Sequence, residues 1–139
     1  MSAELRFVDT NVLVYLFDTD APAKQAAARE IIAAGRLVLS TQVLSEFYVT
    51  VTRKLARPLD SANASRAVAD LCALPVRDVT PSLVQSAIRR CTTDRLSYWD
   101  ALVVETALEA GATLLLTEDL QHGQALGTLR VHNPFLTGS

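Results

Sequence analysis

The sequence has few cysteines and histidines, which argues against two frameworks that are common in small proteins. Of its 139 residues, 2 are Cys and 2 are His. Cys72 and Cys91 belong to no CxxC or Cys/His motif, so we expect neither a disulfide framework nor a structural zinc site. This cysteine usage fits a reducing compartment, and we expect the protein to be cytoplasmic.

Long apolar runs and an excess of positive charge are also missing. The apolar run at 12–17 is far shorter than the roughly 20 residues needed to cross a bilayer, and the first residues carry no basic segment typical of a secretion signal. We therefore expect neither membrane insertion nor secretion. Because the formal net charge is -2, a nucleic acid would have to be held by a local patch and not by the field of the whole chain.

The length and composition predict one folded domain. Hydrophobic residues make up 50% of the chain and charged residues 20%, which is enough apolar material for a core without disulfide or metal staples. We expect a single domain over 1–133, followed by a loose tail at 134–139.

Alternation of short apolar runs with helical patterns predicts an α/β fold. Five runs are typical of strands, at 5–8, 37–39, 76–79, 113–116 and 128–132. Helical patterns with capping residues separate them, at 12–17, 22–34, 41–57, 60–73, 81–91 and 98–110. Strands separated by helices imply a parallel sheet with helices on both sides.

Four acidic residues stand out from the surface acids. Asp9 ends the first predicted strand and Asp119 follows the one at 113–116, so both belong to the sheet edge where α/β proteins bind ligands. Glu46 lies in a largely apolar stretch of a predicted helix. Asp100 lies on an apolar helical row, and a carboxylate that faces the core needs a partner, hydrogen bonds or a metal.

Each acid alone has an ordinary structural explanation. Asp9 could cap the next helix, and Glu46 could pair with Arg53. Asp100 could sit in a first helical turn, and Asp119 could belong to a turn. Together, however, four carboxylates at one sheet edge would repel one another unless cations were bound. Oxygen ligands favour Mg²⁺ or Mn²⁺, and such ions assist phosphodiester hydrolysis.

The segments around these acids resemble the motifs of PIN domains. They are Phe7–Leu13, Ser45–Phe47, Tyr98–Leu102 and Leu116–Leu120, in the order of the family. The short chain is similar to the VapC toxins of bacterial toxin–antitoxin pairs. This resemblance implies a three-layer α/β/α fold with a five-stranded parallel sheet, and a Mg²⁺- or Mn²⁺-dependent endoribonuclease centre.

The resemblance also implies roles for individual residues and partners. It assigns the metal and the catalysis to Asp9, Glu46, Asp100 and Asp119. It assigns supporting contacts to Thr10, Asn11, Thr117 and Glu118. Of the adjacent Glu118 and Asp119 we favour Asp119, because the usual pattern of the family places the acid two residues after the Thr. The implied partners are an RNA substrate, a small VapB-type antitoxin and a second copy of the chain in a homodimer.

Two other functions compete with this interpretation. A phosphoryl-transfer enzyme with an aspartyl nucleophile would also place an Asp after the first strand, but it needs a Lys after a late strand. The only lysines are Lys24 and Lys54, so a required part is missing. A non-catalytic protein-binding or RNA-binding module could use the same acids for structure, although the presence of all four acids disfavours it.

Basic and aromatic residues offer weaker signals for RNA binding. Cationic side chains gather near the ends of two predicted helices, at Arg53, Lys54 and Arg57 and at Arg89, Arg90 and Arg95. They could form a local basic patch, although helix C-termini commonly attract such residues. Tyr98 and Trp99 could stack on a base, although aromatic residues at a helix start are more often packing anchors.

Overall fold

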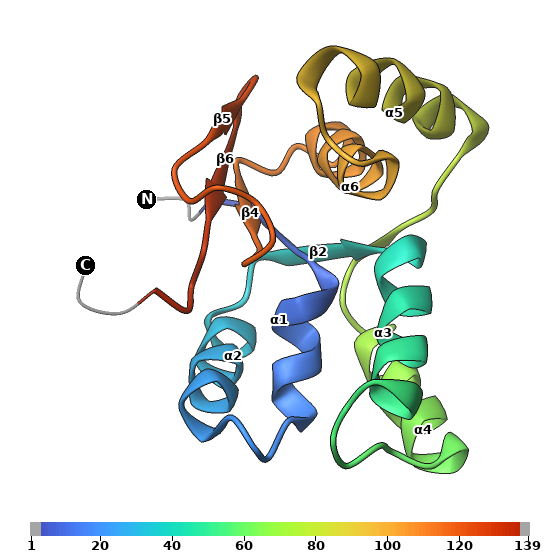
Figure 1. Cartoon of the computed structure of the whole chain (residues 1–139), viewed down its shortest axis with the longest axis vertical. Coiled ribbons are helices and arrows are strands. Elements are labelled where there is room, and N and C mark those ends of the chain that lie inside the picture. The colour runs from blue at the N-terminus through green and yellow to red at the C-terminus, as the bar shows by residue number, and fades with distance from the viewer. Residues whose placement is uncertain (1–3, 137–139) are drawn as a thin grey trace.

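A single mixed sheet forms the centre of the computed structural model, which describes residues 4–136 (Figure 1). The strand order is β3-β2-β1-β4-β6-β5. The strands are β1 (Arg6–Val8), β2 (Leu37–Ser40), β3 (Val76–Arg77), β4 (Leu114–Leu116), β5 (Ala125–Leu126) and β6 (Leu129–His132). The order places β1 in the middle of the sheet, between β2 and β4, as the buried apolar sequence of β1 requires.

The predicted parallel sheet is confirmed, with one correction. All neighbouring strands pair in parallel except β5 and β6, which form an antiparallel hairpin. The sheet therefore has six strands and not the five predicted. The turn between β5 and β6 contains Gly127 with a φ of +64°, a conformation that favours glycine. β5 has two residues between the polar Gln124 and Gly127 and belongs to no apolar run, so the sequence did not reveal it.

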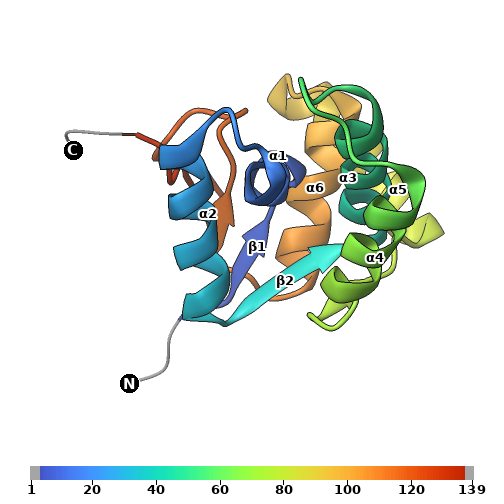
Figure 2. The same cartoon turned by 90° about the horizontal axis from the view of Figure 1, so that it is seen from below.

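Helices cover both faces of the sheet, as predicted. They are α1 (Thr10–Val14), the 3₁₀ helix η1 (Tyr15–Phe17), α2 (Pro22–Ala34), α3 (Thr41–Arg53), α4 (Ser61–Leu71), α5 (Pro81–Asp94) and α6 (Tyr98–Glu109). Figure 1 shows α5 and α6 on one side of the sheet and α1 to α4 on the other, and Figure 2 shows this second group from below. Within residues 4–136, no helix combines the length and the apolar character needed to span a membrane.

Polar caps start three of these helices at the predicted positions. The hydroxyl oxygens of Ser40, Thr80 and Ser97 accept hydrogen bonds from backbone N–H groups in the first turns of α3, α5 and α6. Such caps satisfy donors that the helix itself leaves free. They fix where α3 and α6 begin, and therefore the positions of Glu46 and Asp100 along them.

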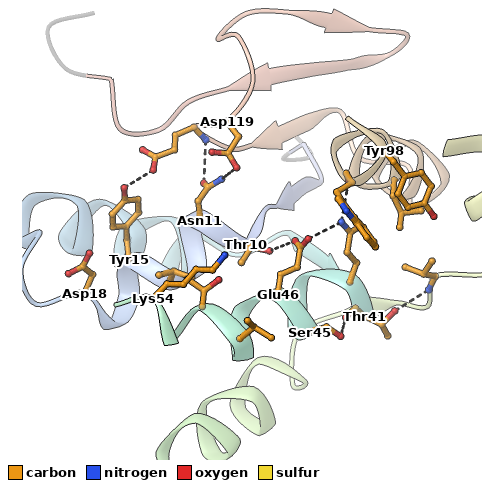
Figure 3. A pocket seen from close by; sticks show the side chains of 18 of the residues that line it. Thr10, Asn11, Tyr15, Asp18, Thr41, Ser45, Glu46, Lys54, Tyr98 and Asp119 are labelled. Carbon is orange, nitrogen blue, oxygen red and sulfur yellow. Dashed lines mark hydrogen bonds between the residues drawn. The ribbon is translucent and has the colours of Figure 1, made fainter. Parts of the chain in front are cut away.

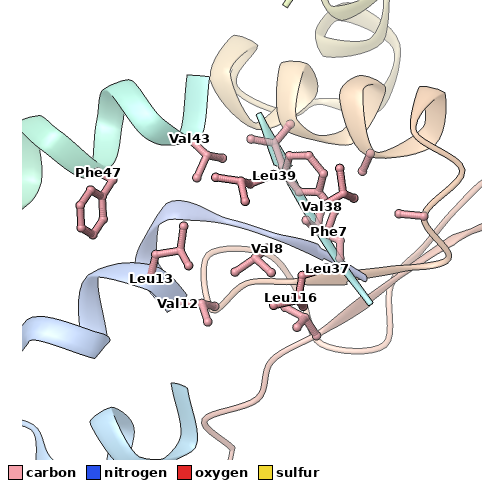
Figure 4. Packing of buried hydrophobic residues seen from close by; sticks show 14 of the residues in the cluster. Phe7, Val8, Val12, Leu13, Leu37, Val38, Leu39, Val43, Phe47 and Leu116 are labelled. Atoms are coloured by element: carbon pink, nitrogen blue, oxygen red, sulfur yellow. The ribbon is translucent and has the colours of Figure 1, made fainter. Parts of the chain in front are cut away.

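The core aligns the ends of β1 and β4. Phe7, Val8 and Leu115 are fully buried (Figure 4 shows Phe7 and Val8). Val8 pairs with Leu116, and the backbone N–H of Asp9 donates to the carbonyl of Leu116 over 3.0 Å. The residues that directly follow β1 and β4 therefore lie side by side at one sheet edge.

The predicted tail at 134–139 is partly described. Phe135 packs edge-on against Tyr15, with ring centroids 4.8 Å apart. Positions 137–139 lie outside the described residues, as do positions 1–3. The described part of the tail is therefore in contact with η1.

Candidate active site

Asp9 lies between β1 and α1 and is only 6% exposed. Its Oδ1 accepts a hydrogen bond of 2.8 Å from the backbone N–H of Thr10, so it caps α1. Its Oδ2 accepts a hydrogen bond of 2.9 Å from the hydroxyl of Thr117. Asp9 therefore caps a helix and also lies at the sheet edge where ligands are expected to bind.

Glu46 projects from α3 toward the same edge and is half-buried (Figure 3). Its Oε1 accepts a hydrogen bond of 3.0 Å from the hydroxyl of Thr10, and its Oε2 accepts one of 3.4 Å from the amide of Gln42. Among the ion pairs of residues 4–136, none joins Glu46 to Arg53. One partner of Glu46, Thr10, therefore belongs to α1, and the other, Gln42, belongs to α3 like Glu46 itself.

Glu118 and Asp119 follow β4 and have different partners. The Asn11 amide donates to Oδ2 of Asp119 over 3.0 Å and to the Thr117 hydroxyl over 3.1 Å. The Glu118 carboxylate instead accepts hydrogen bonds from the Tyr15 hydroxyl at 2.6 Å and from the ammonium of Lys24 at 3.2 Å. Asp119 is thereby tied to the residues around Asp9, whereas Glu118 is tied to η1 and α2.

Asp100 lies in the first turn of α6 and is half-buried. Burial raises the pKa of its carboxyl, the Ser97 hydroxyl lowers it, and the negative charge of Asp119 raises it again. The charge of Asp119 therefore acts on Asp100 although the two residues belong to different elements. The charge of Asp119 thus acts on Asp100 as well as on Asp9.

The same coupling acts on Asp9. The pKa of its carboxyl is raised to about 7, mainly by burial and to a smaller extent by the charges of Asp119 and Glu46, while the hydrogen bonds from Thr10 and Thr117 lower it. Desolvation and like charges both disfavour an ionised acid. A bound cation would have the opposite effect and would favour the ionised form.

The donor groups fit a hard divalent cation, although the four side chains do not converge on one point. No set of three or more acidic, His or Cys side chains among residues 4–136 is arranged to hold a metal ion. The carboxylate oxygens of the buried Asp9, the half-buried Glu46 and Asp100 and the exposed Asp119 nevertheless match the preferences of Mg²⁺ or Mn²⁺.

A cleft of about 940 Å³ opens beside the acids. Its lining includes Glu46 and Asp119, the exposed Trp99, and Lys54 at the end of α3 (Figure 3 shows all but Trp99 labelled). Most lining residues come from α1, α3, α6 and the segment after β4, and others come from η1 and α5.

The basic residues predicted to form a patch differ in whether they line the cleft or are already held in ion pairs. Lys54 lines the cleft. Arg57 pairs with Asp20 at 3.5 Å, and Arg90 pairs with Asp94 of α5 and Glu105 of α6. Lys54 is therefore the one of these three that can meet a ligand in the cleft.

Sequence reasoning missed three residues that hold the acids in place, namely Tyr15, Lys24 and Gln42. Tyr15 and Lys24 bind Glu118, and Lys24 also donates to the Tyr15 hydroxyl at 3.0 Å. Gln42 donates to Glu46 and to the carbonyl of Trp99 at 3.2 Å. Only Gln42 offered a signal, because it lies one helical turn before Glu46.

Comparisons with known proteins agree on one fold. The sequence matches the PIN domain family over residues 6–125. No curated protein matches it. The structure is similar to that of the VapC20 toxin of Mycobacterium tuberculosis, described as cleaving the sarcin-ricin loop, with a TM-score of 0.64 and 21% identity over 79% of this chain and 86% of the toxin.

Two toxin–antitoxin complexes contain similar chains. One from Klebsiella pneumoniae has a TM-score of 0.71 and 17% identity, over 94% of this chain and 98% of that one. The DNA-bound VapBC complex of Salmonella typhimurium has a TM-score of 0.67 and 17% identity, over 95% of this chain and 99% of that one. At this level of identity the similarity concerns the fold.

Proposed function

The chain belongs to the PIN domain family, and from this we propose that it is a metal-dependent endoribonuclease that acts as the toxin of a toxin–antitoxin pair. The observation that carries the proposal is the electrostatic coupling of acids from four different segments at one sheet edge. Asp9 feels the charges of Glu46 and Asp119, and Asp100 feels that of Asp119. Such mutual repulsion is costly without a cation, so it is typical of a site that binds one.

The proposed metal ligands are Asp9, Glu46, Asp100 and Asp119, with Mg²⁺ or Mn²⁺ as the ion. The bound ion would supply charge neutralisation at the phosphodiester and orientation of the attacking water. We favour Asp119 over Glu118 because the Asp119 carboxylate is bound by Asn11, two residues after Asp9, whereas Tyr15 and Lys24 hold Glu118.

The supporting residues orient the acids through hydrogen bonds. The Thr10 hydroxyl fixes one oxygen of Glu46, and the Thr117 hydroxyl fixes one oxygen of Asp9. Asn11 connects α1 to the segment after β4, because its amide donates to Asp119 and its Oδ1 accepts from the backbone N–H of Glu118 at 3.3 Å. Such contacts to metal ligands commonly set their orientation and basicity.

The partners that we propose are RNA, a VapB-type antitoxin and a second copy of the chain. The antitoxin is supported by the toxin–antitoxin complexes among the similar structures. It is also supported by exposed apolar side chains of α3, Tyr48 and Val49, which border a groove between α3 and α4. A reducing cytoplasm would suit Cys72 and Cys91, which are both free thiols.

The deciding experiment is incubation of the purified chain with total cellular RNA in Mg²⁺ or Mn²⁺, beside an EDTA control. We expect discrete fragments with 5'-phosphate and 3'-hydroxyl ends, and none with EDTA or with Asp100→Asn. Cleavage that survives EDTA would contradict the metal-dependent mechanism. Intact RNA after incubation with folded, antitoxin-free protein would favour the non-catalytic binding module.

A further inference from the structure

We infer that Trp99 stacks on a nucleobase of the RNA beside the bond to be cleaved, an inference that rests on the proposed function. Trp99 is 60% exposed, although tryptophan is the largest aromatic side chain and usually packs into a core or an interface. It lines the same cleft as Glu46 and Asp119. The next residue along α6 is Asp100, so an exposed indole and a proposed metal ligand are neighbours in the chain.

The position of Trp99 is fixed relative to the acids. The amide of Gln42 donates to the Trp99 carbonyl at 3.2 Å and to Oε2 of Glu46 at 3.4 Å. The Tyr98 ring meets the Trp99 ring edge-on, with centroids 5.0 Å apart and an angle of 73° between the planes. The Gln42 amide therefore holds the start of α6, and with it the backbone of Trp99, beside Glu46.

The charge of the cleft explains why a base, and not the RNA backbone alone, should provide affinity. The acidic residues on the cleft wall repel phosphate, and the cleft has one lysine, Lys54, among its lining residues within 4–136. Nonspecific attraction to the backbone is therefore weak here. Stacking on an aromatic face does not depend on positive charge and accepts any unpaired base. Trp99 supplies such a face in a cleft that has more acidic than basic lining residues.

Trp99 is the only tryptophan of the chain, so intrinsic fluorescence reports on it directly. The first test titrates the full chain in EDTA with single-stranded RNA of random sequence, about 12 nucleotides long, and in parallel with tripolyphosphate. We expect saturable quenching by the RNA and none by tripolyphosphate. Binding of labelled RNA, measured by anisotropy, without any change in tryptophan emission would overturn the inference. A shift of the emission with protein concentration alone would also overturn it, because a second copy would then cover Trp99.

The second test compares the cleavage kinetics of Trp99→Ala and Trp99→Phe. One base stacked on an aromatic ring corresponds to a loss of about 5- to 150-fold in kcat/KM for the Ala variant, mostly through KM. The Phe variant should keep most of the activity, and the melting temperature should hardly change in either case. The matched control is Ile88→Ala on α5, since Ile88 is 52% exposed but does not line the cleft. Equal kcat/KM for Trp99→Ala and the unsubstituted chain would contradict the inference.

The two tests separate this inference from the proposed function. Quenching by RNA without cleavage by the unsubstituted chain would contradict the nuclease and still support stacking. Metal-dependent cleavage without quenching would contradict stacking and leave the nuclease in place.

Discussion

The hydroxyl of Thr117 donates a hydrogen bond of 2.9 Å to Oδ2 of Asp9. Each residue directly follows a strand, Asp9 after β1 and Thr117 after β4, so the bond joins the carboxyl ends of two neighbouring strands. The same hydroxyl oxygen accepts from the Asn11 amide and from the backbone N–H of Asp119, both at 3.1 Å. The buried Thr117 hydroxyl therefore contacts the carboxylate of Asp9, the backbone of Asp119 and the Asn11 amide, which also binds the carboxylate of Asp119.

Replacing Thr117 tests this arrangement. Thr117→Val keeps the shape of the side chain but removes the donor to Asp9 and the acceptor for Asn11. We expect the rate of RNA cleavage to fall about 10- to 100-fold, the usual effect of losing a partner of a metal ligand, while Thr117→Ser keeps most of the rate. Cleavage rates over a Mg²⁺ titration measure both effects. A Val variant as active as the unsubstituted chain would show that the hydroxyl is dispensable.

Replacing Asp100 separates a catalytic from a structural role. The pKa of Asp100 is raised by burial and by Asp119, so its charge opposes folding at neutral pH. Asp100→Asn removes that charge, and we expect cleavage to fall by about 100-fold or more while the melting temperature in EDTA stays equal or rises. Asp70→Asn, in α4 outside the cleft, is the control and should leave both quantities unchanged. Unfolding of Asp100→Asn would instead indicate a structural role.

The two adjacent acids after β4 should differ in their effect on activity. Asp119→Asn removes the carboxylate that Asn11 binds, and we expect nearly complete loss of cleavage. Glu118→Gln keeps an acceptor for the Tyr15 hydroxyl but removes the ion pair with Lys24, so the rate should fall by less than about 10-fold because ion pairs near the surface are worth little. Parallel single-turnover assays of the two variants decide the matter. The reverse order of effects would make Glu118 the fourth acid.

Stability should depend on pH in a way that a cation reverses. The pKa of Asp9 is raised to about 7 in the folded protein, from 3.8, so the folded state binds more protons than the unfolded state between these values. In EDTA the free energy of unfolding should therefore fall by a few kcal/mol as the pH rises from 4 to about 7, and then level off. Added Mg²⁺ should stabilise the protein more at pH 8 than at pH 5, because ligand carboxylates must be ionised.

Thermal unfolding at several pH values, with Mg²⁺ or EDTA, measures this dependence. A stabilisation by Mg²⁺ that is the same at pH 5 and pH 8 would mean that the ion does not bind at ionised carboxylates of this edge.

The sequence predicted the fold well because its strands and helices carry strong local signals. The caps at Ser40, Thr80 and Ser97 and the apolar runs define most elements within a few residues. The missing strand, β5, has two residues and owes its existence to pairing with β6. Local patterns do not reveal an element that only tertiary pairing stabilises.

The candidate acids could be found in the sequence because a carboxylate in an apolar context is conspicuous. The residues that bind the side chains near the site could not be found in this way, because most of them are far from their partners in the sequence. Tyr15 and Lys24 are separated from Glu118 by 103 and 94 positions, and Gln42 is 57 positions from Trp99. Such contacts depend on how β1, β4 and the helices pack, which no local periodicity encodes.

Crystals soaked in Mn²⁺ test the central claim, that the four acids form one cation site, most directly. We predict an anomalous difference peak at the edge formed by the ends of β1 and β4, in contact with carboxylate oxygens from at least two of the four acids. The same soak of Asp119→Asn crystals should give a weaker peak or none. An unsubstituted protein that binds Mn²⁺ elsewhere, or shows no peak while it still cleaves RNA, would contradict the four-acid site.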